Sequence, residues 1–115
     1  MRRRLAFDPT GFSISISDRD GRAVVVIRGE LDLATAPELE AALTERLDAG
    51  QDVVVDLREL AFLDSTGLRV LVASHARAEG GDATFLIVRP LPGAPIKRIL
   101  DIAGVESVLD FVDDI

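Results

Sequence analysis

The sequence predicts an α/β fold: a small mixed, mostly parallel β-sheet of about four to five strands, with an N-terminal β-hairpin and about three to four flanking helices. Two β-rich segments near the N-terminus are separated by Asp20-Gly21, a dipeptide typical of tight hairpins. After them, short apolar runs alternate with segments of helical periodicity, which indicates crossovers between parallel strands. The 115 residues suffice for one domain with one core.

The first two predicted strands form the hairpin. Phe12, Ile14 and Ile16 alternate with serines, which is the period of a strand with one buried and one wet face. We therefore expect an edge strand here. Residues 23–27 are apolar without interruption, a pattern typical of a strand that is covered on both faces.

A first helix is predicted between Thr35 and Gly50. Thr35 is expected to cap the free backbone N–H groups, and Glu38 to complete a capping box. Pro37 falls in the first turn, where its missing N–H has no cost, and Gly50 ends the helix. The apolar residues share one face at helical spacing: Leu39, Ala42, Leu43 and Leu47.

A second buried strand is predicted over residues 53–55. A short loop over residues 56–63 leads from it to a second helix, which opens at Asp64-Ser65-Thr66-Gly67 and ends at Gly80-Gly81. The residues expected on the inner face of this helix are Leu68, Leu71, Val72 and Ala76.

The C-terminal part predicts a third buried strand over residues 84–88, a loop over residues 90–93 and a third helix. Pro95 fits the first turn of this helix and Gly104 ends it. Residues 108–112 fit either a short strand or a final helical turn. The apolar stripe of the third helix is expected to comprise Ile96, Ile99, Leu100 and Ala103.

Charge and composition restrict the kinds of partner. The formal net charge is −7 and no basic stripe is evident, so we expect no nucleic-acid partner. The lack of cysteine fits a cytoplasmic protein, and no apolar run approaches the roughly 20 residues that span a membrane. Arg2, Arg3 and Arg4 open a basic leader over residues 1–10, which we expect to be flexible, and residues 11–115 form the domain.

Catalytic and metal constellations are absent from the sequence, and we expect no catalytic residue, no metal site and no cofactor. Gly80-Gly81 ends a helix instead of opening one, so it does not match a phosphate-binding loop. His75 is the single histidine, and we expect a partly buried or surface side chain. A small α/β enzyme or nucleotide-binding domain is an alternative, but it would need a phosphate loop or a base–nucleophile pair.

The stretch Asp64-Ser65-Thr66-Gly67 is the most informative one. Asp and Ser are preferred at helix N-caps, so one interpretation is a cap and nothing more. A hydroxyl at a helix start, on the C-terminal side of the strands, also lies where ligand and partner sites gather in open α/β sheets. We expect Ser65 to be accessible to another protein's active site, and Gly67 to allow a backbone or a phosphate to approach closely.

At these residues the sequence resembles STAS domains, and more closely the stand-alone bacterial anti-sigma factor antagonists. The resemblance covers residues 12–112 and departs from the family pattern in the Pro-rich segment 92–95. The stretches that carry it are Gly29-Glu30-Leu31-Asp32 with Thr35, residues 53–57, Leu63-Asp64-Ser65-Thr66-Gly67-Leu68, and residues 99–104.

The resemblance implies a non-enzymatic cytoplasmic regulator that binds an anti-sigma factor, itself a Ser/Thr kinase, and so releases a sigma factor for transcription. Phosphorylation by that kinase would end the complex, and a Ser/Thr phosphatase would reset it. By position, the phosphoacceptor is Ser65, with Thr66 as the weaker candidate. The residues implied in partner binding are Asp32, Thr35, Asp64, Ser65, Thr66 and Gly67.

A second function on the same fold is an accessory subunit of a lipid-transport ABC system, or another STAS scaffold that is not phosphorylated. The Asp64-Ser65 pair favours the phosphorylated regulator, because a scaffold needs no acceptor serine.

Overall fold

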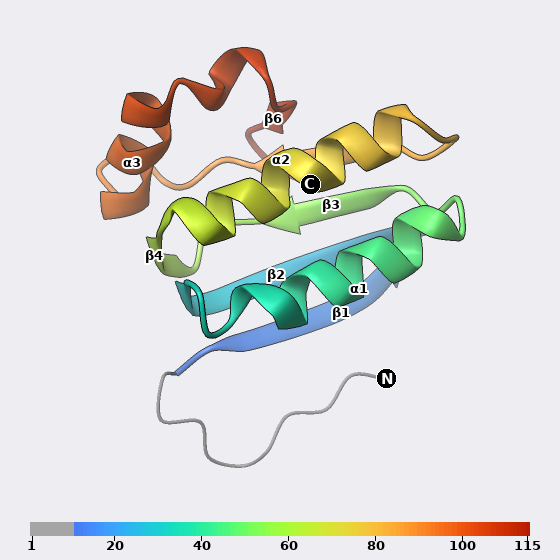
Figure 1. Cartoon of the computed structure of the whole chain (residues 1–115), viewed down its shortest axis with the longest axis horizontal. Helices are drawn as coiled ribbons and strands as arrows, with labels where there is room; N and C mark the ends of the chain where they lie inside the picture. Colours follow the sequence, from blue (N-terminus) through green and yellow to red (C-terminus); the bar gives the residue numbers. More distant parts are fainter. Residues whose placement is uncertain (1–10) are drawn as a thin grey trace.

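The structure, a computed structural model, describes residues 11–115 (Figure 1). The leader predicted over residues 1–10 lies outside this range. The strands are β1 (Ser13–Arg19), β2 (Arg22–Leu31), β3 (Val53–Asp56), β4 (Leu60–Leu63), β5 (Phe85–Val88) and β6 (Phe111–Val112). The helices are α1 (Ala36–Asp48), α2 (Ser65–Glu79) and α3 (Pro95–Ala103), with a 3₁₀ turn η1 (Val105–Ser107).

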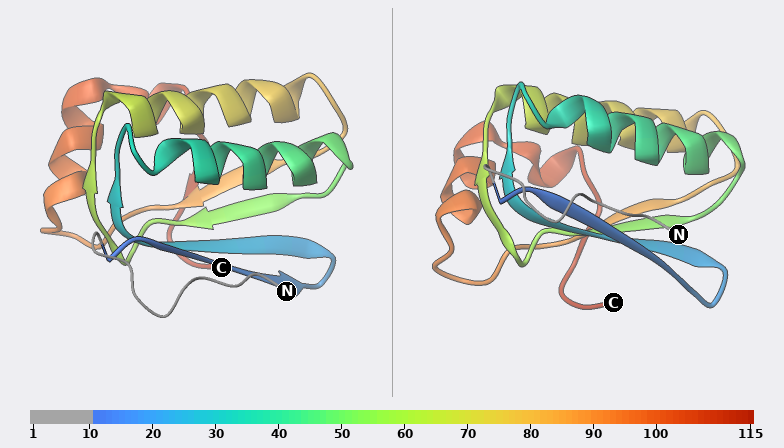
Figure 2. Two further views of the ribbon diagram at one scale, coloured as in Figure 1. Left: turned by 60° about the horizontal axis from the view of Figure 1, so that its bottom comes forward. Right: turned by 90° about the horizontal axis from the view of Figure 1, so that it is seen from below.

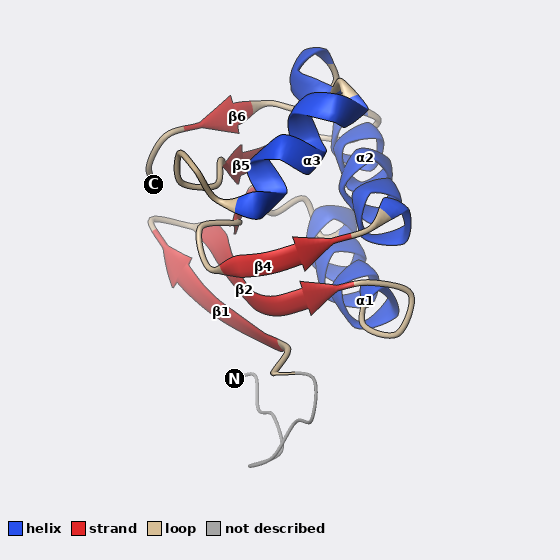
Figure 3. Ribbon diagram, turned by 90° about the vertical axis from the view of Figure 1, so that its left-hand side faces the viewer, coloured by secondary structure: helices blue, strands red, loops and turns tan. Residues whose placement is uncertain are grey.

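The strands form a mixed sheet in the order β1-β2-β3-β5-β6, with β4 paired to β2 beside this path. β1 and β2 are antiparallel, and the other pairs are parallel. Figure 2 shows α1 and α2 on one face of the sheet, and α3 packs against β4 (Figure 3). The predicted mostly parallel sheet with an N-terminal hairpin is confirmed. The short strands β4 and β6 bring the described part of the sheet to six strands.

The turn of the hairpin follows from its sequence. Asp20 and Gly21 both have positive φ angles, 56° and 82°, as the tight turn that matches strand twist requires. Arg19 pairs with Arg22 across the turn, and β1 pairs with β2 along its whole length. β1 therefore lies at the sheet edge, as predicted.

The inner face of α1 is the predicted one, but that of α2 is rotated. Leu39, Leu43 and Leu47 of α1 are buried. On α2, Ala76 is exposed and Leu68 and Val72 are only partly buried. The buried residues of α2 are Gly67, Val70, Leu71, Ser74, His75 and Ala78. Because α2 packs beside α1 as well as over the sheet, small and polar side chains face inward and the apolar stripe no longer marks the inner face.

The third helix agrees with the prediction except at its last turn. Ile96 and Leu100 are buried, whereas Ala103 is exposed because the helix leaves the core there. Gly104 ends α3 in the left-handed conformation, with φ of 69°, as expected for a C-cap glycine.

β4 replaces part of the predicted loop over residues 56–63. Its first and last residues, Leu60 and Leu63, are buried, while Ala61 and Phe62 between them are exposed. This pattern lacks the alternation that marks a strand in sequence. β4 nevertheless pairs with the end of β2, and this pairing positions the site described next.

Candidate functional site

The two conspicuous motifs of the sequence lie side by side at one end of the sheet. Leu31 at the end of β2 pairs with Leu63 at the end of β4. The backbone N–H of Asp64 then donates to the Leu31 carbonyl oxygen at 3.1 Å. The turn from β2 to α1 and the start of α2 are consequently adjacent (Figure 3).

Ser65 is the first residue of α2, and its side chain is exposed. The helix cap comes from Asp64, whose Oδ1 accepts hydrogen bonds from the backbone N–H groups of Thr66 at 2.9 Å and Gly67 at 3.0 Å. The Ser65 hydroxyl makes no hydrogen bond to any residue within the range 11–115. Capping therefore does not occupy this hydroxyl, and another molecule can reach it. Thr66 beside it is half-buried.

Gly67 faces the interior, which corrects the expectation that it lets a partner or a phosphate approach. A Cβ at this position would lie 2.7 Å from Cγ of Leu31 and 2.8 Å from Cδ1 of Leu63. Both leucines are fully buried. The missing side chain allows α2 to pack closely against the ends of β2 and β4.

Thr35 does not cap α1 with its side chain, so the predicted capping box is wrong. Its hydroxyl donates to the Glu30 carbonyl oxygen at 2.7 Å and accepts from the Asp32 backbone N–H at 2.9 Å. Oδ1 of Asp32 accepts from the backbone N–H groups of Ala34 and Thr35. Thr35 is buried, so it shapes this turn from inside and offers no surface to a partner. Asp32 is half-buried and lies at the surface.

Two exposed apolar side chains flank these motifs, and the sequence analysis did not single them out. Leu33, in the turn after β2, is 74% exposed, and Phe62 on β4 is 41% exposed. Phe62 pairs with Glu30, one position from the Leu31–Leu63 pair. A signal for Leu33 was present, since an apolar residue between Asp32 and a helix start has no core to enter.

An ion pair holds the chain between β3 and β4. The buried Asp56 accepts hydrogen bonds from Nη2 of Arg58 at 2.8 Å and from its Nε at 3.0 Å. Burial raises the pKa of the Asp56 carboxyl, but the hydrogen bonds from the side chain and backbone of Arg58, with its charge, lower that pKa below its ordinary value. The turn leading to β4 therefore carries a fixed, ionised pair.

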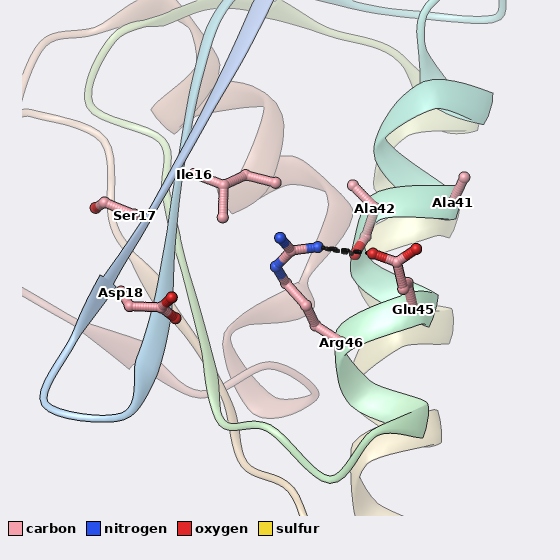
Figure 4. Close-up of a pocket in the computed structure, with 7 residues that line it drawn as sticks. All are labelled: Ile16, Ser17, Asp18, Ala41, Ala42, Glu45 and Arg46. Atoms are coloured by element: carbon pink, nitrogen blue, oxygen red, sulfur yellow. Dashed lines mark hydrogen bonds and ion pairs between the residues drawn. The ribbon is translucent and has the colours of Figure 1, made fainter. Parts of the chain in front are cut away.

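A cavity of about 550 Å³ lies between β1 and α1, on elements other than those of the Ser65 site. Figure 4 shows Ile16 of β1 and Arg46 of α1 pointing into it from opposite sides. The lining residues are Ile16, Ser17, Asp18, Ala41, Ala42, Glu45 and Arg46. This set lacks a base paired with a nucleophile.

His75 is buried on α2, close to two carboxylates. Its Nε2 lies 3.5 Å from Glu79 and its Nδ1 lies 3.9 Å from Asp110, and Nδ1 has no hydrogen-bond partner among residues 11–115. The expectation of a partly buried or surface side chain is therefore wrong. Residues 11–115 contain no group of three or more side chains placed to hold a metal ion. In the same range, no helix combines the length and the apolar character that crossing a membrane requires.

Comparison with known proteins gives a consistent result. A family model described as Mlab, STAS domain matches residues 14–111. The chain is 33% identical over 100 residues to the anti-sigma-F factor antagonist RsfB of Mycobacterium tuberculosis, covering 86% of this chain and 80% of that protein. It is 32% identical over 98 residues to the anti-sigma-B factor antagonist of Staphylococcus aureus, covering 84% and 89%. The crystal structure of an anti-sigma factor antagonist from Mycobacterium paratuberculosis is similar at a TM-score of 0.81 and 28% identity, covering 94% of this chain and 91% of that one.

Proposed function

Because the chain belongs to the STAS domain family, we propose that it is an anti-sigma factor antagonist whose binding to its partner ends when Ser65 is phosphorylated. The partner is an anti-sigma factor that is also a Ser/Thr kinase, and a phosphatase restores the binding form in the cytoplasm. The chain performs no chemistry of its own: the kinase supplies the active site, and this domain supplies the acceptor.

The observation that carries the proposal is the free hydroxyl of Ser65. It is exposed at the start of α2, and Asp64 provides the helix cap in its place. An acceptor must enter a kinase active site without unfolding its own helix, and this arrangement permits it. Leu33, in the turn after β2, and Phe62, on β4, add exposed apolar side chains at the same end of the sheet, which a protein partner would bury.

Electrostatics explain how a phosphate would end binding without a change of fold. Phosphorylation adds about −1.5 to −2 charges at neutral pH. The new group lies beside the carboxylate of Asp64, in a chain with a net charge of −7. Burying such an uncompensated charge in an interface costs roughly 2–5 kcal/mol, which corresponds to about 30- to 5,000-fold in affinity.

Phosphosite mapping tests the proposal. The purified chain is incubated with ATP and each anti-sigma factor kinase encoded in its own genome, and is then analysed by mass spectrometry. We expect one phosphate on Ser65, the same phosphate in a Thr66→Val variant, and none in Ser65→Ala. A phosphate on Thr66 alone, or none with any of these kinases, contradicts the proposal, and the second result favours the non-phosphorylated STAS scaffold.

Binding of variants gives a second readout. We expect Ser65→Ala to hold the kinase persistently and Ser65→Asp to bind it weakly, because only the second variant places a charge in the interface. Turnover of ATP by the purified chain alone would contradict the proposal that the chain has no catalysis of its own.

A further inference from the structure

An arginine lies one helical turn after Ser65. Arg69 is exposed, and residues four apart lie on the same side of an α-helix. Long side chains on a helix also lean toward its N-terminus and cover the preceding turn. An Arg69 side chain with this common orientation reaches the surface beside Ser65.

The charge of Arg69 is not used within the described domain. Its side chain makes no ion pair or hydrogen bond with any residue from 11 to 115. Three other cations on the helices do: Arg46 pairs with Glu45, Arg77 with Asp48, and Lys97 with Asp101. Arg69 can thus form an ion pair with an anionic group of another molecule, or with an anionic group added to its own helix.

A phosphate on Ser65 would find two backbone donors in the first turn of α2 already occupied. The N–H groups of Thr66 and Gly67 both donate to Oδ1 of Asp64. The Asp64 carboxylate also repels a second anion placed next to it. In the first two turns of α2, residues 64–72, Arg69 is the single cationic side chain. Arg69 is therefore the side chain of this segment that can give the phosphate a charge-assisted hydrogen bond from a cation.

We propose that Arg69 binds the phosphate group on Ser65 within the same chain and is thereby withdrawn from the docking surface. This inference rests on the proposed function, because it needs phosphorylated Ser65. An acidic group four residues before a basic one is the favourable order on a helix, and the planar guanidinium can donate to two phosphate oxygens. Phosphorylation then changes the surface that the partner meets in two ways. The surface gains the dianion on Ser65, and it no longer offers the cation of Arg69.

The test uses the full chain with phosphoserine incorporated at position 65 during synthesis, so that no kinase is needed. The second ionisation of the phosphate is followed by ³¹P NMR. We expect Arg69→Gln to raise the phosphate pKa by roughly 0.3 pH units relative to the parent chain, because removing the cation disfavours the dianion. Arg69→Lys should restore part of this difference.

Arg98→Gln is the matched control. Arg98 is an exposed arginine on α3 that likewise has no partner among residues 11–115, so its removal changes the net charge equally. We expect this variant to leave the phosphate titration within about 0.1 pH units, since distant exposed charges are screened. In the parent chain, the Nε–Hε signal of Arg69 should shift over the same pH range as the phosphate.

Identical titrations in the parent chain and Arg69→Gln, or equal shifts in Arg69→Gln and Arg98→Gln, overturn the inference. An unmoved Arg69 Nε–Hε signal also overturns it. Failure of the proposed function is distinguishable, because it would appear as unchanged partner binding after phosphorylation and would leave these NMR titrations unaffected.

Discussion

The backbone N–H of Asp64 donates a hydrogen bond to the carbonyl oxygen of Leu31 at 3.1 Å, and this bond joins the start of α2 to the end of β2. Because β4 pairs with β2 immediately before it, Ser65, the proposed acceptor, lies beside the turn that contains Asp32. The surface around Ser65 is therefore built from two loops that follow the paired ends of β2 and β4. Three expected outcomes follow from the packing and charges around this junction.

Gly67→Ala should destabilise the chain by about 1–3 kcal/mol, because its Cβ would enter the space of two fully buried leucines. Urea denaturation measures the change. Gly81→Ala is the control, since a Cβ there meets only carbonyl oxygens at 3.8 and 4.0 Å. If both variants unfold at the same urea concentration as the parent chain, the close packing of α2 on β2 and β4 is not required.

Asp64→Ala should lower the free energy of unfolding by about 1 kcal/mol, because it removes the acceptor for two backbone N–H groups. Ser65→Ala should change stability by less than about 0.5 kcal/mol, since its hydroxyl has no partner within residues 11–115. Thermal or urea unfolding of the two variants shows whether Asp64 alone caps the helix, with the Ser65 hydroxyl taking no part in the cap. Equal destabilisation by both would mean that Ser65 shares the capping role.

The Asp56–Arg58 pair should make stability dependent on pH. The pKa of Asp56 is lower in the folded chain than its ordinary value of 3.8, because the bonds from Arg58 outweigh the effect of burial. The stability that this carboxylate contributes is therefore complete above its unfolded pKa, near 3.8, and is lost as the pH falls through the lower folded value. Arg58→Met should cost about 1–3 kcal/mol at pH 7.

Urea midpoints measured from pH 3 to 7 check this outcome. In Arg58→Met the free-energy cost of burying the ionised Asp56 is no longer offset by the bonds from Arg58. Stability should therefore begin to fall at a higher pH than in the parent chain. Arg77→Met is the control, because its pair with Asp48 is exposed and should contribute little. Parallel pH curves for Arg58→Met and the parent chain would show that the Asp56–Arg58 pair does not set the acid dependence.

Local signals in the sequence predicted much of the fold. Asp20-Gly21 specifies its turn through two positive φ angles, and Gly104 ends α3 in the left-handed conformation. β4 could not be predicted this way, because its pairing with β2 is non-local and its two central residues are both exposed. The rotation of α2 was not predicted either, because its buried face includes the polar Ser74 and His75, which do not continue an apolar stripe.

The candidate site was predicted in part. The exposure of Ser65 followed from its position at a helix start, whereas the sequence left open whether Asp64 or Ser65 provides the cap. The roles of Thr35 and Gly67 did not, because the hydroxyl of Thr35 bonds to the end of β2 and Gly67 contacts leucines from two strands. Such contacts depend on which strand ends lie together, and composition and periodicity carry no information about that.

The affinity of the partner anti-sigma factor for the two forms of the chain tests the central claim most directly. Isothermal titration calorimetry compares the chain with serine at position 65 and the chain with phosphoserine there. We expect the phosphorylated form to bind at least about 30-fold more weakly, because the dianion would be buried without compensation. Equal affinity of the two forms would contradict the account.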